Sequence, residues 1–306
     1  MGSTRTLGRS GVQVSALGLG TARIGGLGWS RKGDLGTSTD SAAIAESVRA
    51  IHRALDLGVT LFDTADCYGC GQSERILGQA IQGRRQQVVV ATKFGETFDE
   101  ETCESQDVPI TPEYVARACA ASLRRLNTDY IDLYIFHLRD FDMGQAVGIR
   151  DALEDLVTAG KIRYYGWSTD NVERARLFAE GRHCAAIEHR LNIFENNPEM
   201  LRLCKEENLA SLNRIPLLCG VLTGRWNRET QLAEQDRRSD FFRDEGFLKL
   251  LDCVEKLRDV LEQDGGSYVQ GALRWIWTRS EKTIPIPGFR TVDQVEEIAG
   301  AMRLGR

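Results

Sequence analysis

Residues 87–137 read QVVVATKFGETFDEETCESQDVPITPEYVARACAASLRRLNTDYIDLYIFH, with a predicted strand at each end. The strands are Gln87–Thr92 and Ile131–His137. Between them, Thr111–Leu126 repeats apolar residues at the three-to-four spacing of a helix, and it begins with a threonine that can cap it and a proline in the first turn. The stretch therefore predicts a strand–helix–strand unit of a parallel sheet.

The alternation of strand and helix continues over the rest of the chain. The other predicted strands are Ala16–Gly20, Thr60–Asp63, Tyr164–Ser168, Ala185–Glu188, Ala210–Arg214 and Thr283–Ile286. The other predicted helices are Ser41–Leu57, Ser73–Gln82, Gln145–Ala159, Asn171–Ala179, Pro198–Glu207 and Phe247–Gln263, with the extra C-terminal helices Ser267–Arg279 and Val292–Met302. Eight strands without a linker predict one domain over residues 1–306, a closed (β/α)₈ TIM barrel rather than an open doubly wound sheet. Thr4–Val14 alternates around Gly-Arg-Ser-Gly and predicts an N-terminal β-hairpin.

The composition of the 306 residues is that of a soluble globular enzyme. Hydrophobic residues make up 42% and charged residues 27%, while 39 Lys and Arg against 44 Asp and Glu give a net charge of −5. A mildly acidic protein gives no electrostatic reason to expect nucleic acid or an anionic membrane as partner. No apolar run approaches the ~18 residues that span a bilayer, so no membrane partner is expected.

Eight cysteines raise the alternatives of disulfides and of a zinc site. No apolar signal segment precedes the predicted barrel, so we expect a cytoplasmic protein with reduced thiols. Cys67 and Cys70 have the spacing of zinc ligands, but a structural zinc site needs four ligands and no second pair follows. No metal is therefore expected.

Polar side chains stand at the ends of three consecutive predicted strands. Asp63 ends one strand and Tyr68 follows it. Lys93 directly follows the next strand, and His137 ends the third. Each of them alone could have a structural role, such as a loop cap or a core histidine. Because the C-terminal ends of barrel strands meet at one mouth, the four together predict a catalytic site.

This grouping predicts a tyrosine that donates a proton. A tyrosine with its ordinary pKa of ~10 donates poorly at neutral pH unless a nearby ammonium stabilises its anion. We therefore expect Lys93 to lower the pKa of Tyr68 to ~8, with Asp63 keeping the lysine charged. His137 is expected to orient the substrate oxygen by hydrogen bonding. A proton donor that faces a developing alkoxide indicates reduction of a carbonyl group.

Four stretches resemble parts of the aldo-keto reductase family. FDTADCYGCGQSE (62–74), ATKFG (91–95) and IDLYIFHLRD (131–140) resemble its signature regions, and IPIPGFRTVDQ (284–294) resembles its cofactor-binding end. The resemblance covers residues 4–302. It implies that Tyr68 is the general acid, that His137 orients the substrate, and that the lysine and aspartate tune the tyrosine. It also implies a short bacterial-type member without a Rossmann fold, which binds NADPH extended across the mouth.

The same resemblance implies a set of cofactor contacts from the loops after the strands. These residues are Gly20, Thr21, Ser168, Thr169, Glu188, Arg214, Pro216, Leu217, Gly220, Leu222, Gly224, Ile286, Gly288, Arg290 and Gln294. Arg290 also has a direct argument, because barrels often place a phosphate site after the last strand and a guanidinium matches a 2′-phosphate in bidentate fashion. We therefore expect NADPH as the cofactor.

Four positions depart from the family pattern. Thr169, Glu188, Arg214 and Ile298 stand where the family usually has Asn, Gln, an aromatic residue and Asn. Ile298 cannot hydrogen-bond to adenine. Glu188 and Arg214 end consecutive strands, so we expect them to pair, with the guanidinium stacked on the nicotinamide.

The predicted function is NADPH-dependent reduction of an aldehyde or ketone to an alcohol. Two alternatives stay open: an alcohol or aldose dehydrogenase that uses the same site in the oxidative direction, and a cofactor-binding regulatory subunit like the potassium-channel β subunits that resemble this family. The loop Thr21–Thr39, which contains Trp29, is expected to wall the substrate pocket, and the irregular stretch Cys219–Glu245 to serve binding. A single sequence identifies neither the small-molecule substrate nor the oligomeric state.

Overall fold

Eight parallel strands form a barrel in the computed structural model, which describes residues 4–26, 40–232, 234 and 236–304. The strands are β3 (Gly18–Gly20), β4 (Leu61–Asp63), β5 (Val89–Phe94), β6 (Ile131–Phe136), β7 (Ile162–Ser168), β8 (Cys184–Arg190), β9 (Ala210–Arg214) and β10 (Thr283–Pro285). Each strand pairs with its neighbour in chain order, and a bridge between Gly20 and Gly288 closes the ring. The predicted (β/α)₈ TIM barrel is confirmed.

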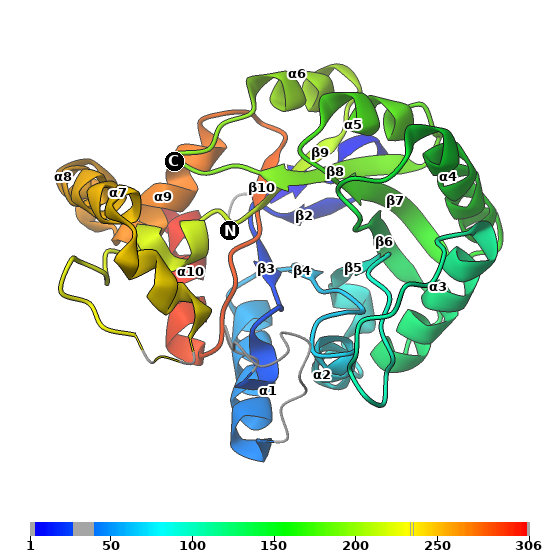
Figure 1. Cartoon of the computed structure of the whole chain (residues 1–306), viewed down its shortest axis with the longest axis horizontal. Helices are drawn as coiled ribbons and strands as arrows, with labels where there is room; N and C mark the ends of the chain where they lie inside the picture. Colours follow the sequence, from blue (N-terminus) through cyan, green and yellow to red (C-terminus); the bar gives the residue numbers. More distant parts are fainter. Residues whose placement is uncertain (1–3, 27–39, 233, 235, 305–306) are drawn as a thin grey trace.

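Helices cover the outside of the barrel (Figure 1). They are α1 (Ser41–Asp56), α2 (Gln72–Ala80), α3 (Pro112–Leu126), α4 (Met143–Thr158), α5 (Val172–Ala179), α6 (Pro198–Glu206), α9 (Tyr268–Trp277) and α10 (Val292–Leu304). At the start of α3, the Thr111 side chain accepts a hydrogen bond from the Tyr114 N–H at 3.3 Å, as a cap should. The apolar faces of the helices pack against outward-facing strand residues such as Tyr134 and Trp167. Within the described ranges, no helix is both long and apolar enough to cross a membrane.

The predicted N-terminal hairpin is also present and lies against the barrel. β1 (Thr4–Thr6) pairs antiparallel with β2 (Gln13–Ser15). Between them, Leu7 is fully buried in the cluster of residues that fills the barrel. Gly8 has a φ of +51°, and a Cβ atom there would lie 2.2 Å from the carbonyl oxygen of Ala185. The hairpin therefore meets the barrel backbone to backbone, which only glycine permits at this position.

The long segment after β9 is more regular than predicted. The stretch Cys219–Glu245, expected to be irregular, overlaps the 3₁₀ helix η4 (Leu218–Thr223) and contains a second one, η5 (Arg237–Arg243). The predicted helix Phe247–Gln263 is divided into α7 (Glu245–Glu255) and α8 (Arg258–Leu261). The division occurs because the Leu257 N–H donates to the carbonyl oxygen three residues back, in a tight turn. The other 3₁₀ helices are η1 (Gly8–Ser10), η2 (Ile24–Gly26), η3 (Arg85–Gln87) and η6 (Gln263–Gly265).

A disulfide joins Cys70 to Cys103, which corrects the expectation that all eight cysteines are reduced thiols. The two Cα atoms are 5.7 Å apart although the cysteines are 33 positions apart in the chain. This proximity arises because consecutive barrel strands place the loops after β4 and β5 next to each other. The spacing of cysteines along a sequence does not reveal such a contact.

Candidate active site

The C-terminal ends of β4, β5 and β6 hold the four residues that the sequence predicts as catalytic. Asp63 is the last residue of β4, Lys93 is next to last in β5, and His137 directly follows β6. Tyr68 lies on the loop between β4 and α2, in a turn where its N–H donates to the Ala65 carbonyl oxygen at 3.3 Å. Because the strands are parallel neighbours, these ends meet at one mouth of the barrel.

Lys93 is fully buried at the centre of this cluster. Its ammonium donates hydrogen bonds to Asp63 Oδ1 at 2.5 Å and to the Thr64 carbonyl oxygen at 3.0 Å. The same nitrogen lies 3.4 Å from the hydroxyl of Tyr68. The rings of Tyr68 and His137 meet edge to face with their centroids 6.1 Å apart. The structure thus brings all four residues together.

Glu188 brings a second carboxylate to this lysine. Its Oε2 lies 3.5 Å from the Lys93 ammonium, and its Oε1 accepts a hydrogen bond from the Ser168 hydroxyl at 3.1 Å. The side chains of Glu188 and Ser168 lie together because the two residues are register partners in β8 and β7. One buried ammonium is therefore shared by two buried carboxylates.

The pKa of Tyr68 is raised, which corrects the expectation that Lys93 lowers it below its ordinary value. Burial of the phenol is the largest cause. Lys93 does lower the pKa, but Asp63 and Glu188 both raise it. The carboxylate of Glu188, which we expected to pair with Arg214, thus offsets part of the lowering of the Tyr68 pKa by the Lys93 ammonium. Tyr68 therefore keeps its proton at neutral pH.

The neighbouring groups are also held in defined protonation states. Burial raises the pKa of Asp63 to about 8 even though Lys93 lowers it, and Glu188 adds to the rise. Burial alone would lower the pKa of Lys93, but the two carboxylates raise it well above its usual range. Burial is also the main reason that the pKa of His137 is lowered, with Lys93 and Arg139 adding to the effect. The imidazole is therefore neutral and the lysine charged.

Arg214 does not pair with Glu188, so that prediction is wrong. Its guanidinium Nη2 instead contacts Asp170 Oδ2, on the loop after β7. The register explains the error, because Arg214 lies opposite Arg190 in β8, two residues beyond Glu188. The Nε and Nη1 atoms of Arg214 are buried without a hydrogen-bond partner among the described residues.

The other residues predicted to bind cofactor lie on the loops of the same mouth. Gly20 and Gly288 form the closing bridge, and the Thr21 hydroxyl is buried and donates to the Asp63 carbonyl oxygen at 3.0 Å. Thr169 is also buried, and its hydroxyl accepts from the Asn171 N–H at 3.2 Å. The segment after β9 contains Pro216, Leu217, Gly220, Leu222 and Gly224, and β10 leads to Ile286. Ile298 belongs to the hydrophobic core. Trp29 lies outside the described residues.

Three arginines from separate loops gather at one side of this mouth. They are Arg23, Arg238 and Arg290. Burial lowers the pKa of Arg290, and the positive charge of Arg238 lowers it further. Burial is the main reason that the pKa of Arg23 falls to about 10, and Arg290 and Arg238 lower it further. The Gln294 side chain accepts a hydrogen bond from the Arg290 N–H at 2.8 Å. Only Arg290 was predicted as a phosphate ligand, because no local sequence pattern links it to the other two.

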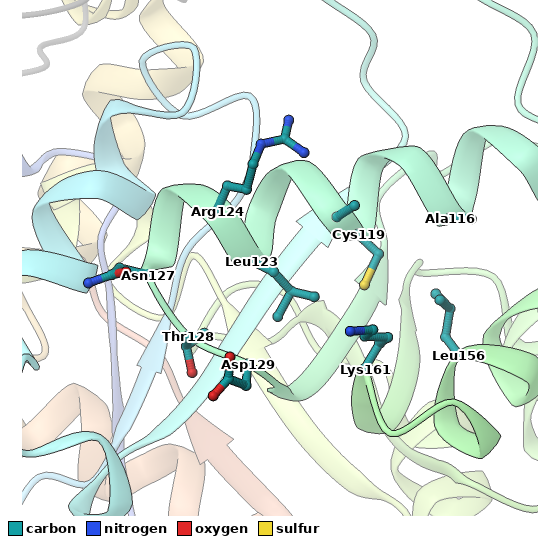
Figure 2. Close-up of a pocket in the computed structure, with 10 residues that line it drawn as sticks. Ala116, Cys119, Leu123, Arg124, Asn127, Thr128, Asp129, Leu156 and Lys161 are labelled. Carbon is teal, nitrogen blue, oxygen red and sulfur yellow. The ribbon is translucent and has the colours of Figure 1, made fainter.

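Two cavities lie elsewhere, lined by none of Arg23, Arg238 and Arg290. A cavity of about 710 Å³ lies between α3 and α4, where Leu123, Cys119, Leu156 and Lys161 line it (Figure 2). It adjoins the residues that lead into β6 and β7. It is therefore at the end of the barrel opposite the tetrad, as we call Asp63, Tyr68, Lys93 and His137 together. A second cavity, of about 570 Å³, is lined by Cys67 and residues of the loop after β5.

The buried cluster of tyrosine, lysine, histidine and carboxylates lies at the C-terminal ends of the barrel strands. This is the place where (β/α)₈-barrel enzymes have their active sites. The chain belongs to the aldo/keto reductase family, whose model matches residues 16–305. The resemblance seen in the four sequence stretches is thereby confirmed.

The names of similar proteins differ in the cofactor and in the reaction that they state. The protein named "Aldo-keto reductase yakc [NADP(+)]" of Schizosaccharomyces pombe is 33% identical over 260 residues, which cover 82% of this chain and 76% of the relative. The NADH-specific methylglyoxal reductase of Escherichia coli is 29% identical, with 97% and 93% covered. The structure of the glycerol dehydrogenase AKR11B4 from Gluconobacter oxydans matches with a TM-score of 0.81 and 31% identity, over 95% of this chain and 87% of that one. Aldo-keto reductases are oxidoreductases that use NADPH or NADH.

Proposed function

We propose that the protein is an NADPH-dependent reductase that converts an aldehyde or ketone to an alcohol, with Tyr68 as general acid. The observation that carries this proposal is the buried Lys93 ammonium, which lies 3.4 Å from the Tyr68 hydroxyl and 2.5 Å from Asp63. An ammonium in this place stabilises the phenolate that forms when the tyrosine gives up its proton. Membership of the family supports carbonyl reduction in general.

In the proposed reaction the nicotinamide, when bound, supplies the hydride, and the protein supplies the proton. Tyr68 donates its hydroxyl proton to the substrate oxygen as negative charge develops there. Lys93 stabilises the resulting phenolate, and the nearby Glu188 carboxylate together with the hydrogen bond to Asp63 favours the charged form of the lysine. The neutral imidazole of His137 can donate one N–H to the same oxygen and so fix its position.

The raised pKa of Tyr68 favours the reductive direction. A tyrosine that keeps its proton throughout the neutral range begins the reaction as a donor. Oxidation of an alcohol at the same site would begin from the phenolate and would require a higher pH. The same residues can catalyse that reverse reaction, and one similar structure is that of a glycerol dehydrogenase. Rates measured in both directions from pH 6 to pH 10 should therefore show reduction dominating at neutral pH.

The mouth also fits a phosphorylated dinucleotide. A guanidinium matches phosphate oxygens in bidentate fashion, and Arg290 lies just before the N-terminus of α10. Arg23 and Arg238 add positive charge beside it, although Arg238 is also paired with Asp236. The buried Nε and Nη1 atoms of Arg214 have no hydrogen-bond partner among the described residues, so a bound ligand could accept from them. We propose that Arg290 and Gln294 lie at the 2′-phosphate end and that Ser168, Thr169 and Arg214 lie at the nicotinamide end.

A substrate panel tests this function. We expect consumption of NADPH with at least one aldehyde or ketone, followed by its absorbance, and much slower consumption of NADH. A protein that binds NADPH tightly but turns over no carbonyl or alcohol would be a cofactor-binding regulatory subunit instead. A clear preference for NADH, as in the name of the relative from Escherichia coli, would refute the phosphate assignment.

A further inference from the structure

Three potential metal ligands meet beside the tetrad. Cys67, Glu96 and His137 each offer one ligand atom, and these three atoms lie within 4.8 Å of one another. We propose that they bind a thiophilic divalent cation, with Zn²⁺ as the best match, and that the bound cation inhibits the enzyme. The inhibition rests on the proposed reductase function, whereas the binding does not.

The distances are close to those of a coordinated ion. Cys67 Sγ lies 3.8 Å from His137 Nδ1, and Glu96 Oε1 lies 4.0 Å from the same nitrogen. Zinc ligands at the usual bond lengths, in tetrahedral geometry, are separated by roughly 3.4–3.6 Å. The two distances to His137 Nδ1 therefore need contractions of well under about 1 Å, and the third pair of ligand atoms lies within 4.8 Å. Glu96 can supply most of this movement, because its side chain is 49% exposed.

The fold holds the three ligands in place through consecutive strands. Cys67 lies on the loop after β4, Glu96 follows β5 by two residues, and His137 directly follows β6. Cys67 is buried, whereas His137 is only partly so. All three ligands thus follow neighbouring strands, two of them buried or partly buried and the third, Glu96, exposed at the rim.

The donor set selects the kind of ion. A thiolate, an imidazole and a carboxylate suit zinc, whereas magnesium and calcium prefer oxygen ligands alone. Three protein ligands leave the fourth tetrahedral position open, as in catalytic zinc sites. An ion can reach the ligands from the cavity of about 570 Å³, which both Cys67 and Glu96 line.

Binding would change the active site in two ways. Coordination replaces the S–H bond of Cys67 with a sulfur–zinc bond, and the proton is released to solvent. The imidazole of His137 is held by its Nδ1 atom and drawn toward the ion. A cation on Nδ1 fixes the orientation of the ring and adds positive charge beside Lys93 and Tyr68, so the hydrogen bond from the imidazole to the substrate oxygen changes in direction and strength. We therefore expect saturating Zn²⁺ to lower kcat/KM for the carbonyl by at least about tenfold.

Cobalt provides a direct test that does not depend on activity. Chelator-treated full-length protein is titrated with Co²⁺ in thiol-free buffer, and the near-ultraviolet absorption of a cobalt–thiolate bond is followed. We expect the band in the wild type and in Cys253→Ser, which removes an exposed thiol elsewhere. The band should disappear in Cys67→Ser. Glu96→Gln, at an exposed position, should weaken Co²⁺ binding about tenfold or more while its circular dichroism stays that of the wild type.

The results separate the two parts of the inference. Absence of the band in the wild type, or its persistence in Cys67→Ser, would refute the metal site. A cobalt-binding protein whose carbonyl reduction is not slowed by Zn²⁺ would refute the inhibition. Relief of zinc inhibition in both Cys67→Ser and Glu96→Gln, but not in Cys253→Ser, would support it. Absence of any reductase activity would count against the proposed function, while the cobalt band would still decide the metal site.

Discussion

Glu188 is a buried carboxylate 3.5 Å from an ammonium that already has Asp63 as a partner at 2.5 Å. Burial of two carboxylates against one lysine is costly unless their negative charge is compensated. Here Lys93 stays charged, and the pKa of Asp63 rises to about 8, which favours its neutral form. The same negative charge makes the phenolate of Tyr68 harder to form. At the residue scale, Glu188 is therefore a tuning group for the proposed acid.

Replacing Glu188 with Gln should shift the pH dependence of reduction to lower pH. The carboxylate raises the pKa of Tyr68, so its removal lowers that pKa, and the tyrosine then loses its proton at lower pH. Since reduction needs the protonated tyrosine, the alkaline decline of kcat/KM should begin earlier. The pH profile with saturating NADPH measures this. An exposed control, Glu173→Gln, should leave it unchanged, and an unshifted or upward-shifted limb in Glu188→Gln would contradict the tuning role.

Replacing Arg290 with Leu should weaken the binding of NADPH much more than that of NADH. A charge-assisted hydrogen bond contributes about 1.5–3 kcal/mol, so the Kd for NADPH should rise about tenfold to a hundredfold. Arg202→Leu, at an exposed position in α6, is the matched control. Quenching of intrinsic fluorescence by each nucleotide gives the two Kd values. Equal weakening for both nucleotides would place the 2′-phosphate elsewhere.

The tetrad could be predicted from the sequence because each member lies at or near the end of a strand, and strand order in a barrel follows chain order. The partners of Arg214 could not be predicted in this way. Strand order places β8 beside β9, but only the register shows that Arg190, rather than Glu188, lies opposite Arg214. Its ion-pair partner, Asp170, comes from the loop after a third strand.

At the scale of elements, the sequence predicted strands and helices better than the loops between them. Strand β6 and helix α3 have nearly the predicted ends because a strong apolar pattern, a cap and a proline act together. The tight turn at Leu257, which divides the helix after η5, has no glycine or proline to mark it. The contact between Cys70 and Cys103 likewise depends on two neighbouring loops rather than on either segment alone.

The hairpin supplies a stability prediction at this scale. Gly8 and Gly11 both have positive φ values, but a Cβ at Gly8 would lie 2.2 Å from a backbone oxygen, whereas a Cβ at Gly11 would meet no atom within 4 Å. Gly8→Ala should therefore destabilise the protein by about 1–3 kcal/mol more than Gly11→Ala does. Urea unfolding followed by circular dichroism compares the two variants. Equal unfolding midpoints would show that the hairpin is not fitted against the barrel as described.

At the scale of the whole molecule, the barrel assembles groups that are remote in the chain. Although the net charge of the protein is −5, Arg23, Arg238 and Arg290 lie near one another at one side of the mouth. Arg23 and Arg238 are more than two hundred positions apart in the chain. Composition gave no sign of this basic cluster, since it depends on how the loops after β3, β9 and β10 meet. The fold class was predictable from alternation alone, whereas the proximity of these arginines required the closed ring.

The most direct test of the proposed function is the Tyr68→Phe variant. It keeps the aromatic ring and removes the hydroxyl that lies 3.4 Å from Lys93. With a carbonyl that the wild type reduces, kcat should fall by roughly 10²–10⁴-fold, while the Kd for NADPH stays within about twofold. Tyr130→Phe, just before β6 at the opposite end of the barrel, should behave as the wild type. A kcat for Tyr68→Phe equal to that of the wild type would show that Tyr68 is not the acid.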